Sequence, residues 1–331
     1  MRKKWIRGGI FLCLVLLLLS NLNRILCVKS PHGVDQTRYL YVQPKNKIDV
    51  LFLGSSHVHC NVNTQLLWDE YGMAAYLMTG AEQPLWNSYY NLKEALKTQK
   101  PKLVVLDMFC PSRFYDDFQP GWADENLDGM RISLNKLEAV YTSVQEEQSH
   151  FFLGFTEYHS RYDQLTTEDF QNFVWNRKTQ ERWKGYTPLN RHAELTEPDM
   201  SHVTTSQEMT EKSKEYFEKI VELTKKEGIT LALISGPYLL EERDQMVYNS
   251  IGQLAEKDGL LFWNTNTPAH YREMGLDFST DYADHAHLNE AGGAKYTAYL
   301  GKWLSQNYSF PDRRGQKGYE SWENQLMKSG E

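Results

Sequence analysis

Short apolar runs alternate with amphipathic segments along most of the chain. The runs are residues 48–54 (IDVLFLG), 74–78 (AAYLM), 102–109 (KLVVLDMF), 229–235 (ITLALIS) and 259–264 (GLLFWN). Brief apolar runs bounded by polar residues are typical of strands buried on both faces of a parallel sheet. We therefore predict five strands.

The segments between the strands have helical spacing. In residues 84–98, apolar side chains recur on one side, and Pro84 suits the first turn of a helix. Further helices are predicted over residues 63–71, 206–227, 241–257 and 288–306. Strands that alternate with helices predict an α/β fold, here a three-layer α/β/α sandwich with a parallel, flavodoxin-like sheet.

Residues 111 to about 205 interrupt this alternation. They are rich in Asp, Glu, Gln, Trp and Tyr, with helical stretches near 133–148 and 167–177. We predict a mostly helical insertion in one α/β domain that spans residues 47–310. A polar C-terminal tail is expected over residues 311–331.

The N-terminus has the pattern of a membrane-targeting segment. Basic residues precede the apolar run IFLCLVLLLL, and no small-x-small cleavage site follows Leu19. We predict an uncleaved signal anchor over residues 1–28, with its basic end in the cytoplasm and the body of the chain outside. Cleavage would instead give a secreted protein. Residues 29–46, which are polar and contain two prolines, are predicted to form a stalk.

Composition excludes some classes of function. The net charge is −7, and no long basic run occurs in the body of the chain, so nucleic acid is not expected as a partner. Four cysteines are too few for a disulfide scaffold. Cys60 and Cys110 each follow a predicted strand, and the sequence leaves open whether they pair or remain buried thiols.

Reactive side chains gather where the first predicted strand ends. Gly54-Ser55-Ser56-His57 leaves that strand towards a helix, and ligands of open α/β sheets bind at the carboxyl ends of strands. A serine at such a turn can attack an acyl carbon while its own N–H helps to hold the oxyanion. The alternative is an ordinary helix cap.

A second cluster lies near the C-terminus, in Asp284-His285-Ala286-His287-Leu288-Asn289. An acid three residues before a histidine can reach the imidazole and hold the tautomer that accepts a proton from serine. The alternative is a polar loop whose aspartate caps the last helix. Because both clusters follow strands of the same sheet, we expect Ser56, Asp284 and His287 to meet.

Together, the GSSH turn and the D-x-x-H-L-N-x-x-G segment resemble the SGNH (GDSL-like) hydrolase superfamily. The similarity covers roughly residues 46–110 and 206–306, and is greatest to membrane-anchored, extracytoplasmic members of D-alanyl transfer and polysaccharide O-acetylation. The resemblance implies that Ser56 is the nucleophile, with Asp284 and His287 as its partners. It also implies an oxyanion hole from the N–H groups of Ser56 and Gly80.

One element of that family pattern is missing. The expected G-x-N-D after the third strand reads Asp107-Met108-Phe109-Cys110-Pro111 here, so the usual oxyanion amide is absent. Gln83 and Asn87 are the candidates to replace it. Further residues that could contact substrate are His57, Asn87, His159, Arg161 and Ser235.

The sequence therefore predicts a serine esterase or O-acyltransferase that needs no cofactor and acts on cell-envelope glycans. A transferase would work with a membrane O-acyltransferase partner, again by resemblance. Two alternatives remain open. One is an inactive SGNH-like domain that binds carbohydrate or acts as a scaffold, and the other is a zinc hydrolase that uses His57, His59, His285 and His287.

Overall fold

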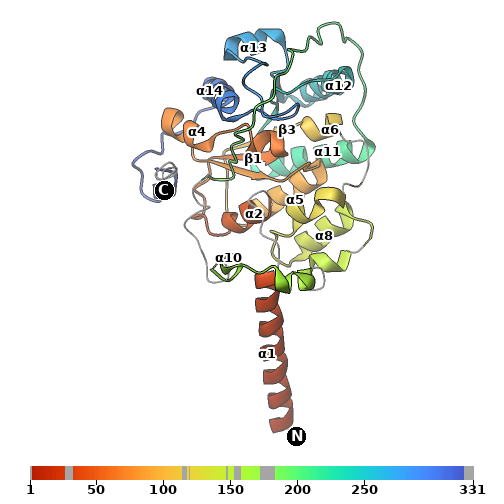
Figure 1. Cartoon of the computed structure of the whole chain (residues 1–331), viewed down its shortest axis with the longest axis vertical. Helices are drawn as coiled ribbons and strands as arrows, with labels where there is room; N and C mark the ends of the chain where they lie inside the picture. The colour runs from red at the N-terminus through yellow and green to blue at the C-terminus, as the bar shows by residue number, and fades with distance from the viewer. Residues whose placement is uncertain are drawn as a thin grey trace.

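A five-stranded parallel sheet forms the centre of the computed structural model (Figure 1). The structure describes residues 2–26, 33–113, 118, 120–146, 148–152, 158–171 and 183–323. The strand order is β2-β1-β3-β4-β5, and every neighbouring pair is parallel. The strands are β1 (Val50–Gly54), β2 (Ala75–Thr79), β3 (Leu103–Asp107), β4 (Thr230–Ser235) and β5 (Leu261–Asn264). All five predicted strands are confirmed.

Helices cover both faces of the sheet, because side chains alternate between the faces along each strand. Leu51 and Leu53 of β1 belong to a core that also contains side chains of α5 (Leu85–Ala95), α11 (Glu211–Glu227) and α12 (Glu242–Asp258). Val50 and Phe52 belong to the opposite core, with side chains of α4 (Thr64–Tyr71), α13 (Pro268–Met274) and α14 (Glu290–Asn307). The predicted three-layer sandwich with flavodoxin-like strand order is confirmed.

The insertion has two parts that differ in structure. Its first part contains short helices, of which α8 (Leu134–Ser143) packs against α5. The others are α6 (Phe109–Arg113), η1 (Pro120–Trp122), α7 (Ala123–Leu127), η2 (Gln148–Phe151), η3 (His159–Asp163) and α10 (Thr167–Gln171). The helix predicted over 167–177 is described only as far as residue 171, and the rest lies outside the described residues.

The second part of the insertion, residues 183–205, contains no helix, so the expectation of a mostly helical insertion fails there. Its backbone binds three separate elements: the N–H of Leu77 donates to Lys184, the N–H of Thr187 donates to His59, and Ala193 pairs with Tyr282. The backbone groups of this segment are satisfied by other elements and do not need a helix. At Ala193 this part therefore runs beside the loop that carries Asp284 and His287.

Both flanking segments differ from the sequence prediction. Residues 34–40 form α2 (Val34–Leu40), in which Gln36 donates to the carbonyl of Gly185, so this part of the predicted stalk is packed into the domain. At the other end, α15 (Glu320–Glu323) buries Trp322, whose indole N–H donates to the carbonyl of Ala75. The predicted polar tail is thus folded as far as residue 323.

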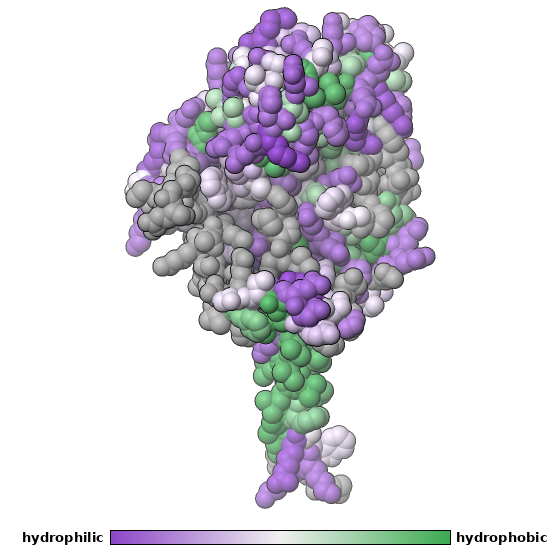
Figure 2. All heavy atoms as spheres, in the orientation of Figure 1, coloured by the Kyte–Doolittle hydropathy of each residue, from purple (hydrophilic) through white to green (hydrophobic). Residues whose placement is uncertain are grey.

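The first helix, α1 (Arg2–Leu26), projects from the domain, and most of its side chains are exposed (Figure 1). Figure 2 shows that this helix is hydrophobic along most of its length and hydrophilic at the end far from the domain. Among the described helices, α1 is the one long and apolar enough to cross a membrane, over Lys3–Asn23 with a mean hydropathy of 1.9. A signal sequence has the same length and composition, so both forms of the N-terminal prediction remain.

Candidate active site

The turn after β1 holds Ser56 at the carboxyl edge of the sheet. Ser55 caps the short helix α3 (Ser56–His59), because its Oγ accepts a hydrogen bond from the N–H of His57 at 3.3 Å. Gly54 is required before it, since a Cβ at that position would lie 2.5 Å from the Cβ of Asp107. Ser56 is therefore the first residue of α3, and its side chain is half-buried.

The loop before α14 brings a histidine and an aspartate to the same point. The Nε2 atom of His287 lies 2.8 Å from Oγ of Ser56, although the two residues are 231 positions apart. The Nδ1 atom of His287 lies 2.8 Å from Oδ1 of Asp284. A proton on Nδ1, shared with the carboxylate, leaves Nε2 free to accept the serine proton.

The region around Asn61 joins these two distant parts of the chain. Its Oδ1 accepts from the N–H of Leu288 at 3.0 Å, and its carbonyl accepts from the hydroxyl of Thr297 at 3.1 Å. Thr297 in turn accepts from the N–H of Asn63 at 2.9 Å. The beginning of α14 is thereby fixed against the chain that follows Ser56. Asn61 belongs to no sequence motif, so nothing in the sequence points to it.

Asp284 is held in its charged form. Burial alone would raise the pKa of its carboxyl, but the hydrogen bond and charge of His287, with the N–H groups of Ala286 and His287, outweigh burial and lower that pKa well below its ordinary value. Arg191, from the last part of the insertion, adds an ion pair at 3.1 Å through Nη2. An ionised carboxylate keeps the imidazole oriented towards Ser56.

Asp107, at the end of β3, binds the turn that carries Ser55 and Ser56. Its Oδ2 accepts from the hydroxyl of Ser55 at 3.1 Å, and its Oδ1 accepts from the N–H of Phe109 at 3.3 Å. Burial raises the pKa of this carboxyl to about 7, although these hydrogen bonds oppose the rise. Asp107 is the first residue of the segment that replaces the expected G-x-N-D. Its carboxyl positions the side chain of Ser55.

His57 lies beside His287, with ring centroids 5.5 Å apart, but it is buried and does not line the rim of a cleft. Its ring stacks on Phe109 at 3.5 Å and meets the edge of Tyr238 at 4.9 Å. Burial lowers the pKa of its imidazole well below the ordinary value, so the ring is neutral. Among the described residues, neither ring nitrogen has a hydrogen-bond partner.

Three predicted contributors are committed to structural contacts. The side-chain amide of Gln83 donates to Met78 and Ser88 and accepts from Asn91, so it is not placed as an oxyanion donor. The Oδ1 of Asn87 accepts from the hydroxyl of Ser143 between α5 and α8. The hydroxyl of Ser235 accepts from Asn266 and is buried. These contacts are internal to the protein and do not favour a substrate or oxyanion role for Gln83, Asn87 or Ser235, and the three roles remain predictions.

Gly80 directly follows β2, whose last residue Thr79 pairs in register with Gly54. Gly80 therefore lies at the same edge of the sheet as Ser56. A Cβ at this position would lie 2.4 Å from Oδ1 of Asn126, so a close approach requires glycine here. Its predicted role as an N–H donor to an oxyanion remains a prediction.

His159 and Arg161 belong to a different region from Ser56. Both lie in η3, which contacts α1, and Nη1 of Arg161 donates to the carbonyl of Leu26 at the end of that helix. The structure therefore does not support the prediction that these two side chains contact substrate, because the guanidinium of Arg161 binds Leu26 and Asp169 instead.

The histidines of the zinc alternative do not converge. Nδ1 of His59 is 3.2 Å from the hydroxyl of Thr79, and the side chain of His285 is exposed. Across the described ranges, no group of three or more His, Cys, Asp or Glu side chains could hold a metal ion. Cys60 and Cys110 are free, buried thiols, and burial raises the pKa of each.

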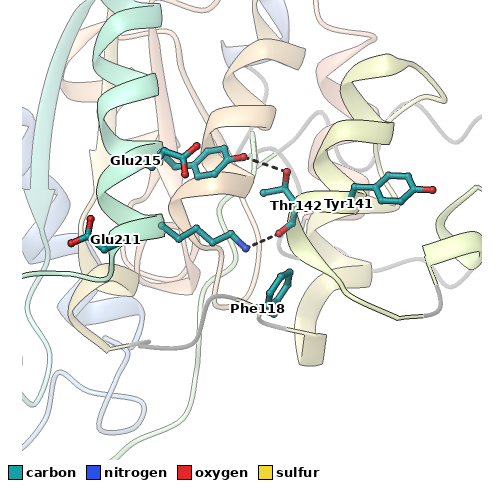
Figure 3. A pocket seen from close by; sticks show the side chains of 7 residues that line it. Phe118, Tyr141, Thr142, Glu211 and Glu215 are labelled. Carbon is teal, nitrogen blue, oxygen red and sulfur yellow. Dashed lines mark hydrogen bonds between the residues drawn. The ribbon is translucent and has the colours of Figure 1, made fainter.

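A separate pocket of about 550 Å³ lies between α8 and α11 (Figure 3). It is lined by Phe118, Tyr141, Thr142, Glu211, Lys212, Glu215 and Tyr216. Lys212 donates to the carbonyl of Thr142, and the hydroxyls of Tyr216 and Thr142 are 3.3 Å apart. Since Ser56, Asp284 and His287 are not among its lining residues, this pocket is distinct from the candidate active site.

Comparisons with known proteins show distant structural likeness. Neither a protein-family model nor a curated protein matches the chain by sequence. A candidate acylhydrolase of Bacteroides fragilis matches with a TM-score of 0.40 and 13% identity, over 82% of this chain and 94% of that chain. An acetylxylan esterase of Geobacillus stearothermophilus matches with a TM-score of 0.38 and 12% identity, over 81% and 97% of the two chains. These values are too low to assign the chain to a family.

Proposed function

We propose that the protein is a serine-dependent acyl-ester hydrolase or O-acyltransferase of the SGNH type. The observation that supports this most directly is the pair of 2.8 Å contacts that links Ser56, His287 and Asp284. Three side chains from two distant parts of the sequence share one line of hydrogen bonds at the edge of the sheet where ligands of α/β proteins bind. An inactive binding domain has no need for that alignment.

In the proposed reaction, Oγ of Ser56 attacks the carbonyl carbon of an ester as its proton passes to Nε2 of His287. The N–H groups of Ser56 and Gly80 stabilise the negative oxygen of the tetrahedral intermediate. The C–O bond to the alcohol then breaks, and the imidazolium returns the proton to the leaving oxygen. Water, or the hydroxyl of a sugar, attacks the acyl-enzyme through the same steps in reverse.

The substrate class rests on the N-terminal helix. If α1 anchors the chain with the domain outside the membrane, its esters are those of the cell envelope, and an acetylated glycan is the proposed substrate. The transfer form of the reaction would receive its acyl group from a membrane O-acyltransferase partner. Hydrolysis and transfer both pass through the proposed acyl-enzyme on Ser56, so the same variants test either reaction.

Turnover of 4-nitrophenyl acetate by the purified full chain tests the proposal. Ser56→Ala should reduce kcat/KM by at least about 10³-fold, because the nucleophile and its hydrogen bond to His287 are both lost. Ser55→Ala is the matched control. It removes the cap of α3 and should lower the free energy of unfolding by about 1 kcal/mol while retaining most of the activity.

Three results would contradict the proposal. Full activity of Ser56→Ala with loss in Ser55→Ala would move the nucleophile by one residue. Inactivation by a chelator would favour a metal enzyme. Wild-type protein that neither hydrolyses nor transfers acetyl groups, yet binds glycans, would favour the binding role.

A further inference from the structure

The exposed part of α1 has little spare length for a membrane-crossing segment. From Lys3 to Ser20 the side chains are exposed except for the half-buried Val15. At a rise of 1.5 Å per residue, this stretch of a helix spans about 27 Å. The hydrocarbon core of a bilayer is about 30 Å thick, so the stretch is barely long enough to cross it.

The domain begins immediately after that stretch. Asn21, Leu22 and Asn23 are half-buried, and Leu26 is 5% exposed. The end of α1 contacts η3 and α10, and these contacts fix the helix to the insertion. No free segment of chain therefore lies between Ser20 and the surface of the domain.

Arg161 strengthens this junction. Its guanidinium donates through Nη1 to the carbonyl of Leu26, one of the terminal carbonyls that an α-helix leaves without an internal partner. The same guanidinium lies 3.4 Å from Oδ1 of Asp169, which belongs to α10. The angle at which α1 leaves the domain is thus set by side chains of the insertion.

Two aromatic side chains are exposed on the elements that contact α1. Tyr162 in η3 is 74% exposed, and Phe170 in α10 is 51% exposed. Figure 1 shows α10 at the end of the domain from which α1 emerges. Aromatic side chains, Tyr and Trp above all, are favoured at the boundary between hydrocarbon and water, which offers both apolar and polar surroundings.

We propose that η3 and α10 form a membrane-docking surface, with Tyr162 and Phe170 in the headgroup layer of the bilayer that α1 crosses. The partner is the lipid bilayer itself. With about 27 Å of free helix, α1 cannot span the hydrocarbon unless the domain rests on the membrane surface. This inference depends on α1 being retained as a membrane anchor, and it is independent of the chemistry at Ser56.

Fluorescence quenching in nanodiscs tests the docking surface. The full chain, with Cys13→Ser and Cys27→Ser, receives a single environment-sensitive label at Tyr162→Cys, Phe170→Cys or Ser160→Cys. Ser160 is exposed, and a label there leaves the side chains of Tyr162 and Phe170 unchanged. The control label is at Ala269→Cys, which is exposed on α13 at the opposite end of the molecule (Figure 1). The discs contain phosphatidylcholine and phosphatidylglycerol, with or without a lipid that carries a nitroxide near its headgroup.

The nitroxide lipid should quench the labels at 160, 162 and 170 at least about twofold more than the label at 269. Equal quenching at all four positions would overturn the docking surface. A label on Cys13, with Cys27→Ser retained, measures the anchor separately. If that label is not quenched by a second lipid, which carries its nitroxide on the acyl chain, α1 is not in the bilayer and the inference fails with it. Turnover of 4-nitrophenyl acetate in the same discs reports on the proposed function independently.

Discussion

The region around Ser56 and the region around η3 and α10 each contain a short cluster of reactive side chains, but the two regions differ in burial and in what they contact. At the edge of the sheet, Ser55, Asp107 and His57 are almost completely buried, and Asp284 and His287 are tied to each other at 2.8 Å. At η3 and α10, Tyr162 and Phe170 are exposed, and both elements contact α1.

The difference shows what a polar cluster in a sequence can and cannot indicate. His57-x-His59 and His159-x-Arg161 look alike as short groups of reactive side chains. The first follows a strand, whose position in a parallel sheet is fixed by its neighbours, and it lies beside His287. The second lies in an irregular insertion, and Arg161 is used to hold a helix end. A strand end before the cluster is what separates the two cases.

The largest expected effect concerns the carboxylate at the edge of the sheet. Asp284→Asn should lower kcat/KM on 4-nitrophenyl acetate by about 10³- to 10⁴-fold, because an amide no longer favours the imidazole tautomer that accepts the serine proton. Asp277→Asn is the matched control. It makes the same chemical change on an exposed residue of the same loop and should retain nearly full activity. Similar losses in both variants would mean that the loop, and not the carboxylate, is required.

A smaller effect, on stability, is expected from Asp107, whose carboxyl binds Ser55. The pKa of Asp107 is about 7 in the folded protein against an ordinary value of 3.8, so between these values the folded state binds a proton that the unfolded state has released. This group therefore makes the free energy of unfolding fall as the pH rises from about 4 to about 7, with no further change above.

Asp107→Asn should remove that dependence. Relative to the wild type, the variant should gain up to about 4 kcal/mol between pH 4 and pH 7, at about 1.4 kcal/mol per pKa unit. Urea unfolding of both proteins over this range measures the gain. If the difference in the free energy of unfolding between wild type and Asp107→Asn does not change with pH, the pKa of Asp107 is not raised in the folded protein.

The smallest effect is expected at the other region. Arg161→Gln removes the charge that holds the end of α1 but touches none of the residues around Ser56. Its kcat/KM on 4-nitrophenyl acetate should stay within about twofold of the wild type, while the label at Ser160 should be less quenched by nitroxide lipid. A tenfold loss of kcat/KM would indicate that Arg161 does contribute to the active site, and the contrast between the two regions would fail.

The fold and the serine-histidine-aspartate geometry were accessible from the sequence because both follow from local rules. Apolar runs located the strands, and the carboxyl ends of parallel strands lie at one edge of a sheet, which predicted that Ser56 and His287 lie together. The role of Asp107 was not predicted: the sequence shows it only as part of the segment that replaces G-x-N-D, and its contact with Ser55 appears only in the structure.

Other contributors left no local signal. Arg191 reaches Asp284 from the part of the insertion that has neither helical nor strand spacing, and Asn61 acts through a long-range hydrogen bond to Leu288. The segment around Trp322 is polar in composition, yet one indole buried against β2 fixes it to the domain. Such contacts depend on tertiary packing, which a single sequence does not display.

Covalent labelling with a fluorophosphonate tests the central claim most directly. Such a probe is attacked by an activated serine oxygen, and peptide mass spectrometry locates the adduct. The account predicts one adduct, on Ser56, in the wild-type chain, and at least about 10³-fold slower labelling in His287→Ala. No adduct on Ser56, or an unchanged rate in His287→Ala, would show that this hydroxyl and this imidazole do not work together.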